Sequence, residues 1–299
     1  MKKTIYSLRG AALLAMVAAM PVVTACSDDD GEGGGAGEAA RLTVVVAEGD
    51  GTSPLDEGLR LGMFMTGGDG ASVVSAVMTA GAGGQLAGAD AITAAMQDGM
   101  TLAAFTPADL WTAANYGQAV QFSVQTDQSA EAAYSASDLM MSPLTPVSGG
   151  KAALVMEHKM AKVSVHVTDV TGLYDLAQAS MDMPSRLTTV DADLVQGTVT
   201  TVEGVTADIT CHSPGNSPYR ASGQAVVAPG PVAAGAVLTS LAVDGQTFTY
   251  TLPEGAEWQG GKEYVYSMRL TSEGLVTYDS YVTDWKDNGE DLSGDAEKQ

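Results

Sequence analysis

The sequence has few of the residues that most often carry catalysis, metal binding or cross-links. Its 299 residues include two cysteines and three histidines, which leaves little material for a zinc site or a disulfide framework. Lysine and arginine number 14 against 36 aspartates and glutamates, and the formal net charge is −22. Because the basic residues are also scattered, the sequence argues against nucleic acid and anionic lipid as partners.

Catalytic motifs are missing as well. The sequence has neither a His-Glu-x-x-His nor a Gly-x-Ser-x-Gly pattern, and the glycines between positions 81 and 88 lack the spacing of a dinucleotide-binding loop. Asp191, Asp193 and Glu203 could contribute to calcium binding, but they do not form a complete calcium loop, so a solvated turn is the favoured interpretation. We therefore expect no enzyme activity, no cofactor and no metal.

The longest apolar run lies near the start of the chain, between a basic start and Cys26. It covers residues 11–25 and ends in Val-Thr-Ala-Cys, the pattern of a lipobox. This predicts a lipoprotein signal peptide over residues 1–25, cleavage between Ala25 and Cys26, and acyl chains on the Cys26 thiol. An ordinary secretory peptide with a chance cysteine is the alternative. No later segment reaches the ~20 apolar residues of a membrane span.

Residues 26–41 are acidic and rich in glycine, and they begin with Ser-Asp-Asp-Asp after the cysteine. Such a composition predicts a solvated tether. The segment also resembles the export signal that sends lipoproteins of the Bacteroidota to the outer face of the outer membrane, which implies a surface-exposed, lipid-anchored protein. A plain spacer is the alternative interpretation.

The rest of the chain has the periodicity of β-strands. Segments that alternate apolar and polar residues, or are rich in β-branched residues, are separated by Gly, Pro and Asp at 42–47, 120–124, 154–160, 163–167, 237–243, 248–252, 264–270 and 275–282. Antiparallel β-sandwiches are typical of this pattern. Helical patterns are few and short, at residues 89–97, 130–140 and 172–179.

Two strand details are specific. Asp244-Gly245 between two alternating segments predicts a tight hairpin turn, because glycine tolerates positive φ. The apolar parity of residues 154–160 changes in residues 163–167, which predicts a bulge or bend between Met160 and Val163. His158 shares the apolar parity of its segment and is interpreted as a core residue. Cys211 has no partner once Cys26 carries lipid, so we expect it to be buried and unreactive.

Five short motifs follow the lipobox in order. They are an apolar-x-apolar-x-His-x-apolar-Ala-Lys-apolar strand at 154–163, Val-Val-Ala-Pro at 226–229, the hairpin at 243–250, Gly-Lys-x-Tyr-x-Tyr at 261–266 and Asp-Trp at 284–285. Their order resembles that of the fimbrillin-like family, the pilus subunits and relatives of the Bacteroidota, over nearly the whole chain.

The resemblance implies an all-β fold of two tandem antiparallel β-sandwich domains with transthyretin-like Greek-key topology. In this chain the domains would cover residues 42–165 and 166–286, followed by a polar tail at 287–299. The implied function is that of a cell-surface structural or accessory pilus subunit with a role in adhesion. Other pilus subunits and a host or bacterial surface ligand are the implied partners.

In the family, a trypsin-like protease cuts after an arginine that follows the first strand, and a strand of another subunit fills the groove left behind. By resemblance, the cut would fall after Arg60, in the turn-rich connector. A cut at the second basic site, Arg41, would leave the first strand in place. Arg60 as a plain surface residue is the alternative. The exchanged strand would present one apolar face, formed by Leu42, Val44 and Val46.

The C-terminal end differs from that of polymerising relatives. Residues 286–299 are polar and lack apolar alternation, and residues 275–285 could act as a donor strand only if their own sandwich does not use them. A tip, accessory or anchor role therefore fits as well as a stalk role. The alternative function is a monomeric surface lipoprotein that binds glycan or host matrix. Three tryptophans could form a sugar-stacking platform, but core packing is the favoured interpretation for Trp111, Trp258 and Trp285.

Overall fold

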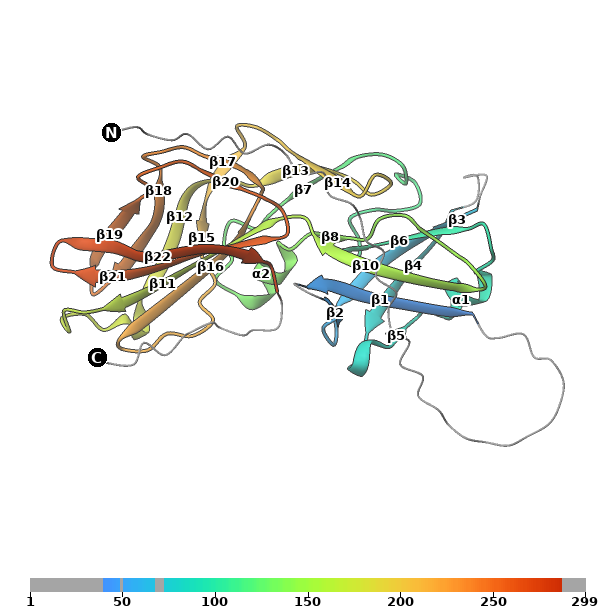
Figure 1. Cartoon of the computed structure of the whole chain (residues 1–299), viewed down its shortest axis with the longest axis horizontal. Coiled ribbons are helices and arrows are strands. Elements are labelled where there is room, and N and C mark those ends of the chain that lie inside the picture. The colour runs from blue at the N-terminus through green and yellow to red at the C-terminus, as the bar shows by residue number, and fades with distance from the viewer. Residues whose placement is uncertain (1–39, 49–50, 68–72, 287–299) are drawn as a thin grey trace, which may run out of the picture. The chain divides into compact units, whose positions relative to one another are not determined.

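The computed structural model describes residues 40–48, 51–67 and 73–286, and it is almost entirely β-sheet, as predicted (Figure 1). The predicted signal peptide, Ala25, Cys26, nearly all of the tether and the polar tail lie outside the described residues. The helices are short: η1 (Ala82–Gly84), α1 (Asp90–Ala95), α2 (Glu131–Ala136) and η2 (Leu176–Gln178). In the described part of the chain, no helix has the length and apolar character to cross a membrane.

The N-terminal part of the chain builds a nine-stranded sheet. Its order is β2-β1-β10-β8-β6-β3-β4-β5, with β9 paired to β6. The strands are β1 (Arg41–Glu48), β2 (Gly51–Pro54), β3 (Arg60–Thr66), β4 (Val73–Ala80), β5 (Leu86–Ala87), β6 (Thr101–Thr106), β8 (Met140–Met141), β9 (Thr145–Pro146) and β10 (Lys151–His158). One apolar cluster fills this part and includes Leu61, Met63, Leu102, Leu154 and Met156.

The C-terminal part contains two four-stranded sheets that share one core. The first has the order β16 (Arg220–Val227), β11 (Ala161–Asp169), β21 (Lys262–Thr271) and β22 (Gly274–Asp284), which Figure 1 shows side by side. The second has the order β15 (Thr206–Thr210), β12 (Ser180–Leu187), β18 (Val237–Val243) and β19 (Gln246–Thr251). Two smaller sheets join β14 (Thr198–Thr201), β13 (Thr189–Asp193) and β7 (Val120–Ser123), and β17 (Gly230–Val232) with β20 (Ala256–Trp258).

The predicted hairpin is confirmed. β18 and β19 pair antiparallel around Asp244 and Gly245, whose φ angles are 48° and 73°. Two consecutive residues with positive φ are the signature of a type I′ turn, whose twist matches that of the strands it joins. Asp tolerates this conformation better than most residues, and glycine adopts it without cost.

The parity change after residue 160 has a different cause from the one predicted. The chain does not form one long bulged strand there, because β10 ends at His158 in the nine-stranded sheet and β11 begins at Ala161 in a different sheet. A change of sheet reverses which face is buried, and this explains the switch. By strand pairing, the change of sheet lies at Lys159–Met160, while the predicted domain division at 165/166 falls inside β11. The division into two domains remains a prediction.

The predicted antiparallel pairing holds for most ladders, and two ladders differ from it. β1 pairs with β10 in parallel, and so does β11 with β21. Both pairs join strands far apart in the sequence, which parallel pairing requires since the chain must cross over between them. The remaining ladders are antiparallel.

Glycine 223 shows how closely the two C-terminal sheets pack. A Cβ at this position of β16 would lie 2.8 Å from the Met181 Sδ and 2.9 Å from its Cβ on β12. We expect Gly223→Val to lower the free energy of unfolding by about 1–3 kcal/mol, because overpacking forces neighbouring side chains out of their preferred rotamers. Urea unfolding measures the change. Gly215→Val is the control, since a Cβ there meets open space; an equal loss in both variants would contradict the prediction.

Candidate functional site: the junction groove

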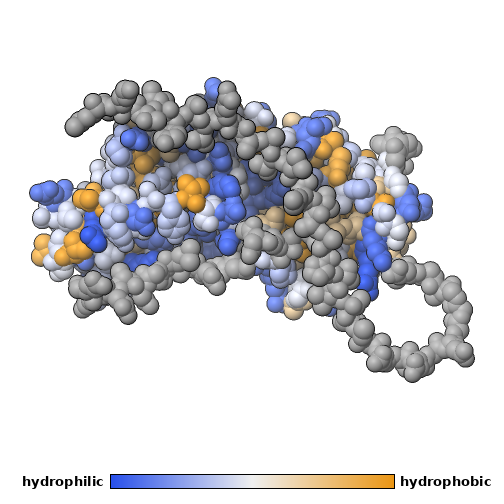
Figure 2. All heavy atoms as spheres, viewed as in Figure 1, coloured by the Kyte–Doolittle hydropathy of each residue, from blue (hydrophilic) through white to orange (hydrophobic). Residues whose placement is uncertain are grey.

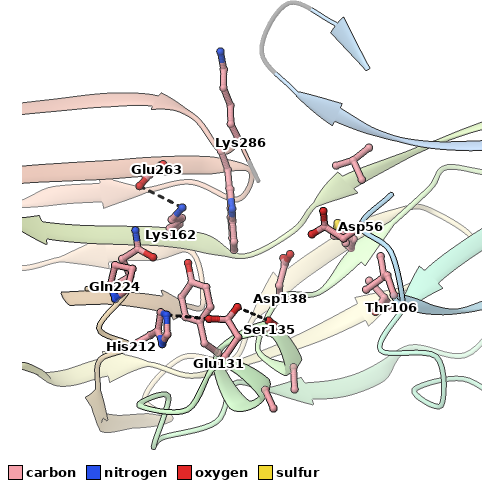
Figure 3. A pocket seen from close by; sticks show the side chains of 18 of the residues that line it. Asp56, Thr106, Glu131, Ser135, Asp138, Lys162, His212, Gln224, Glu263 and Lys286 are labelled. Carbon is pink, nitrogen blue, oxygen red and sulfur yellow. Dashed lines mark hydrogen bonds and ion pairs between the residues drawn. The ribbon is translucent and has the colours of Figure 1, made fainter. Parts of the chain in front are cut away.

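A broad groove of about 1500 Å³ opens where the chain passes from the nine-stranded sheet to the first C-terminal sheet. We call it the junction groove. It is lined by the end of β1, the segment between β2 and β3, the turn after β6, α2, and the outer face of the sheet β16-β11-β21-β22 (Figure 3). Its lining includes Val46, Arg60, Asp138, Lys162, Trp285 and Lys286.

The polar side chains of the groove interact mainly with one another. Lys162 Nζ lies 3.5 Å from Glu263 Oε1, which also accepts a 2.6 Å hydrogen bond from Ser164 Oγ. On the α2 side, Glu131 lies 3.0 Å from His212 Nε2 (Figure 3). Both pairs are thus formed within the lining of the groove itself. Among the described residues, no group of three His, Cys, Asp or Glu side chains is placed to hold a metal ion.

Trp285, which lines the groove, stacks on His158 behind it. The two rings stack with centroids 4.3 Å apart and planes 6° from parallel, and both side chains are buried. His158 Nδ1 lies 2.9 Å from Asp138 Oδ2, which fixes the orientation of the imidazole ring. Lys162 Nζ lies 5.9 Å from the centroid of the indole ring, within the range of a cation–π contact.

Two glycines allow the backbone to approach this stack. A Cβ on Gly260 would lie 2.5 Å from the carbonyl oxygen of Lys159, so only glycine fits there. Gly261 has φ of 73°, and its N–H donates to the carbonyl of Met160 at 2.8 Å. The carbonyl of Gly261 accepts a 3.0 Å bond from the N–H of Trp285. The Gly-Gly pair thus joins the start of β21 to the change of sheet and to the end of β22.

Three of the sequence motifs therefore meet at one place. The His-x-Met-Ala-Lys strand supplies His158 and Lys162, the Gly-Lys entry supplies the close backbone approach, and the Asp-Trp pair supplies Trp285. Asp284 also forms an ion pair with Lys262 on the neighbouring strand. Sequence reasoning identified His158 as a core residue, which its burial confirms. It did not identify Asp138, since nothing in the sequence sets this aspartate apart from other acidic residues.

The predicted exchange strand corresponds to β1. Val44 and Val46 are buried and Leu42 is half-buried, so the apolar face predicted from the sequence does point into the core. β1 pairs in parallel with β10, from Arg41 opposite Lys151 to Val46 opposite Met156. On its other side it pairs antiparallel with β2. The sequence did not indicate β2. Because β1 and β10 run in the same direction, both strands end at the junction groove.

Arg60 and Arg41 each stand at the first position of a strand. Arg60 begins β3 with an exposed side chain, instead of lying in the connector as predicted, and it pairs with Thr79 of β4. The next residue, Leu61, is fully buried. Residues Asp56 to Gly58, shortly before Arg60, are exposed. A protease would reach the bond after Arg60 only where the first pair of β3 opens locally.

The other residues singled out in the sequence are structural. All three tryptophans are buried, which confirms core packing and argues against a sugar-stacking platform. On the face in Figure 2, hydrophobic side chains form small separate groups among hydrophilic ones. Asp191 is exposed on β13, and Asp193 accepts a bond from the N–H of Gln196 at 3.0 Å, as expected for a turn.

The sequence model of the fimbrillin-like family matches residues 45–285. The chain belongs to the fimbrillin-like family. This match includes β1 from Val45 onward and ends at Trp285, so it covers the whole junction groove apart from Lys286. A comparison with curated proteins gives no match.

Solved structures resemble this fimbrillin-like chain in fold. A candidate cell adhesion protein from Bacteroides uniformis is 21% identical, with a TM-score of 0.58 over 78% of this chain and 93% of that one. A second candidate cell adhesion protein, from Bacteroides ovatus, is 12% identical, with a TM-score of 0.66 over 84% of this chain and 99% of that one. Identities this low show a shared fold and do not transfer a ligand.

Cys211 is buried, as predicted, and burial raises the pKa of its thiol far above the usual range, with the Asp182 carboxylate adding to the shift. The thiolate is the reactive form. We therefore expect no alkylation of Cys211 by iodoacetamide in the native protein at pH 8, and complete alkylation in urea. Intact mass after labelling measures this in a Cys26→Ser variant, where Cys211 is the only thiol. Rapid labelling of the native protein would contradict the prediction.

Proposed function

We propose that this chain is a cell-surface subunit of a fimbrium, structural or accessory, which joins other subunits through the position that β1 occupies. One observation carries the proposal. β1 contributes buried apolar side chains to the core, yet it lies next to β2, the outermost strand of its sheet. In the sequence, β1 and β2 precede Arg60, and all other strands follow from Arg60 onward. A single cut after Arg60 would leave β1 and β2 held by non-covalent contacts alone.

After loss of β1, a sheet whose place is filled by a new strand is more stable than one whose place is left open. The segment before Arg60 buries Val44, Val46 and Leu55 in the core cluster. Full burial of each such side chain contributes roughly 1.5–3 kcal/mol. Its loss would also leave the edge of β10 without its parallel partner, and an unpaired edge is a template for another strand. A strand from another subunit with apolar residues at alternate positions would restore both contributions.

The proposed location follows from the N-terminal sequence. Signal cleavage before Cys26 and acylation of its thiol would anchor the chain in the outer membrane, and residues 26–41 would hold the two proposed domains, 42–165 and 166–286, away from the lipid. The family match and the cell-adhesion relatives support a place at the cell surface or in a fimbrium. No cofactor is needed for this role.

The C-terminal end limits the stalk role. β22 pairs with β21 along its whole length, from Gly274 opposite Thr271 to Asp284 opposite Lys262. Residues 275–285, the candidate donor segment, are therefore used within their own sheet. This supports a tip, accessory or anchor subunit, which needs to accept a strand but not to donate one.

Limited trypsin digestion of the mature chain tests the proposal. We expect a product whose new N-terminus is residue 61, since the exposed turn before Arg60 allows local opening of β3. Arg60→Gln should abolish this product, whereas Arg41→Gln, at the start of β1, should leave it unchanged. Edman sequencing identifies the product, and native mass spectrometry then follows its assembly with a synthetic peptide of residues 41–48 as a stand-in donor.

Two outcomes would overturn the proposal. The first is a chain that trypsin does not cut after Arg60 under native conditions. The second is a cut chain that neither binds the peptide nor associates. Either result would favour the alternative, a monomeric surface lipoprotein that binds glycan or host matrix. The burial of all three tryptophans gives that alternative no aromatic platform among these residues.

A further inference from the structure

Two strands of the nine-stranded sheet separate methionines from aromatic rings by face. In β3, Met63 and Met65 belong to the apolar cluster that contains Val44 and Val46, here called the β1 cluster, whereas Phe64 between them belongs to the C-terminal core. β6 divides its leucine and its phenylalanine between the two clusters in the same way. Because neighbouring residues of a strand face opposite sides of the sheet, the side that meets β1 receives flexible aliphatic chains and the other side receives rings.

The β1 cluster as a whole is rich in methionine and has no aromatic residue. Among the described residues it contains seventeen buried side chains, of which six are methionines, namely Met63, Met65, Met78, Met96, Met140 and Met156. The C-terminal core contains thirty-eight buried side chains, of which five are methionines and eight are aromatic. Both clusters belong to one chain, so the composition of the whole chain does not explain the difference.

Methionine makes a core adaptable. Its side chain is unbranched and has three rotatable bonds, so it fills gaps of different shape, and surfaces that bind several partners are often rich in it. Rings and side chains branched at Cβ have fewer conformations and fit fewer neighbours. β1 itself is held laterally by backbone pairing with β10, from Arg41 to Val46, and this pairing does not depend on which side chains the strand carries.

We propose that the position of β1 accepts strands whose apolar side chains differ in size, because the methionines of the β1 cluster repack around them. The partner that it fits is an extended segment of another subunit with apolar residues at the places of Leu42, Val44 and Val46, whether these are valine, leucine, methionine or phenylalanine. Main-chain pairing with β10 holds such a segment, and the apolar cluster rejects polar side chains. The inference rests on the proposed function for the occupant, whereas the repacking is a property of the intact chain.

A larger side chain in the intact chain tests the repacking. Val44 is 1% exposed in the β1 cluster, and Val190, 0% exposed in the C-terminal core, is the matched control. Each lies on a strand next to the outermost strand of its sheet, and Val190 pairs with Phe122. Urea unfolding is followed by pulsed hydrogen exchange on peptides that cover β10 and β13. Val44→Phe should raise the equilibrium constant for unfolding of β10 less than about fivefold, and Val190→Phe should raise that of β13 at least about thirtyfold. Equal effects would overturn the proposal.

Stiffening the methionines tests the cause. A background with Met63→Ile, Met65→Ile and Met156→Ile keeps side chains of similar size but branches each at Cβ. In this background, Val44→Phe should raise the equilibrium constant for unfolding at least about tenfold more than it does in the unchanged chain. If the background does not fold, Met156→Ile alone takes its place in the same comparison. An equal effect of Val44→Phe in the presence and absence of the isoleucines would overturn the proposal.

Peptides that replace β1 test the range of partners. The chain cut after Arg60 is titrated with peptides of residues 41–48 that carry valine, leucine, phenylalanine or asparagine at position 44. We expect the first three Kd values to lie within about fivefold of one another, and the asparagine peptide to bind at least about thirtyfold more weakly. Tight binding of the valine peptide alone would overturn the repacking and leave strand exchange intact. Binding of none of the peptides would overturn strand exchange, while the two unfolding experiments would still decide the repacking.

Discussion

The structure depends on one close backbone contact, the approach of Gly260 to the carbonyl of Lys159. At this point the chain leaves the nine-stranded sheet and enters the first C-terminal sheet, and no side chain larger than hydrogen fits between the two backbones. Once this contact is made, Gly261 bonds to Met160 and Trp285 bonds to Gly261, so that β10, β21 and the end of β22 are fixed together. Three of the five family motifs meet at this contact.

The sequence predicted most of the strands because one face of each is buried. The content of β-branched residues identified β1, period-two alternation identified β18, β19 and β21, and turn chemistry identified the hairpin at Asp244-Gly245. Core packing of the three tryptophans was favoured because they lie far apart in the sequence, and all three are buried. These are local signals, since a side chain on a strand of known parity either faces the core or does not.

The parts that sequence reasoning missed are non-local. The parallel pairing of β1 with β10 joins residues about a hundred positions apart, and no pattern in the sequence of β1 indicates which strand it pairs with. The parity change near residue 160 was visible, but a bulge and a change of sheet produce the same alternation. Short β2 has no apolar pattern, and Asp138 is one of 36 acidic residues. Only the fold shows that it orients His158.

The chemistry of the groove is that of a joint. Lys162 and Glu263 form an ion pair in the groove, and Trp285 is buried against an imidazole that Asp138 orients. These contacts, with the Gly260–Gly261 turn, join the ends of β10 and β22 to the starts of β11 and β21. Parallel pairing with β10 brings the end of β1 to the groove, and the end of β22 lies at the same groove, so the proposed exchange strand and the C-terminal strand meet at one place.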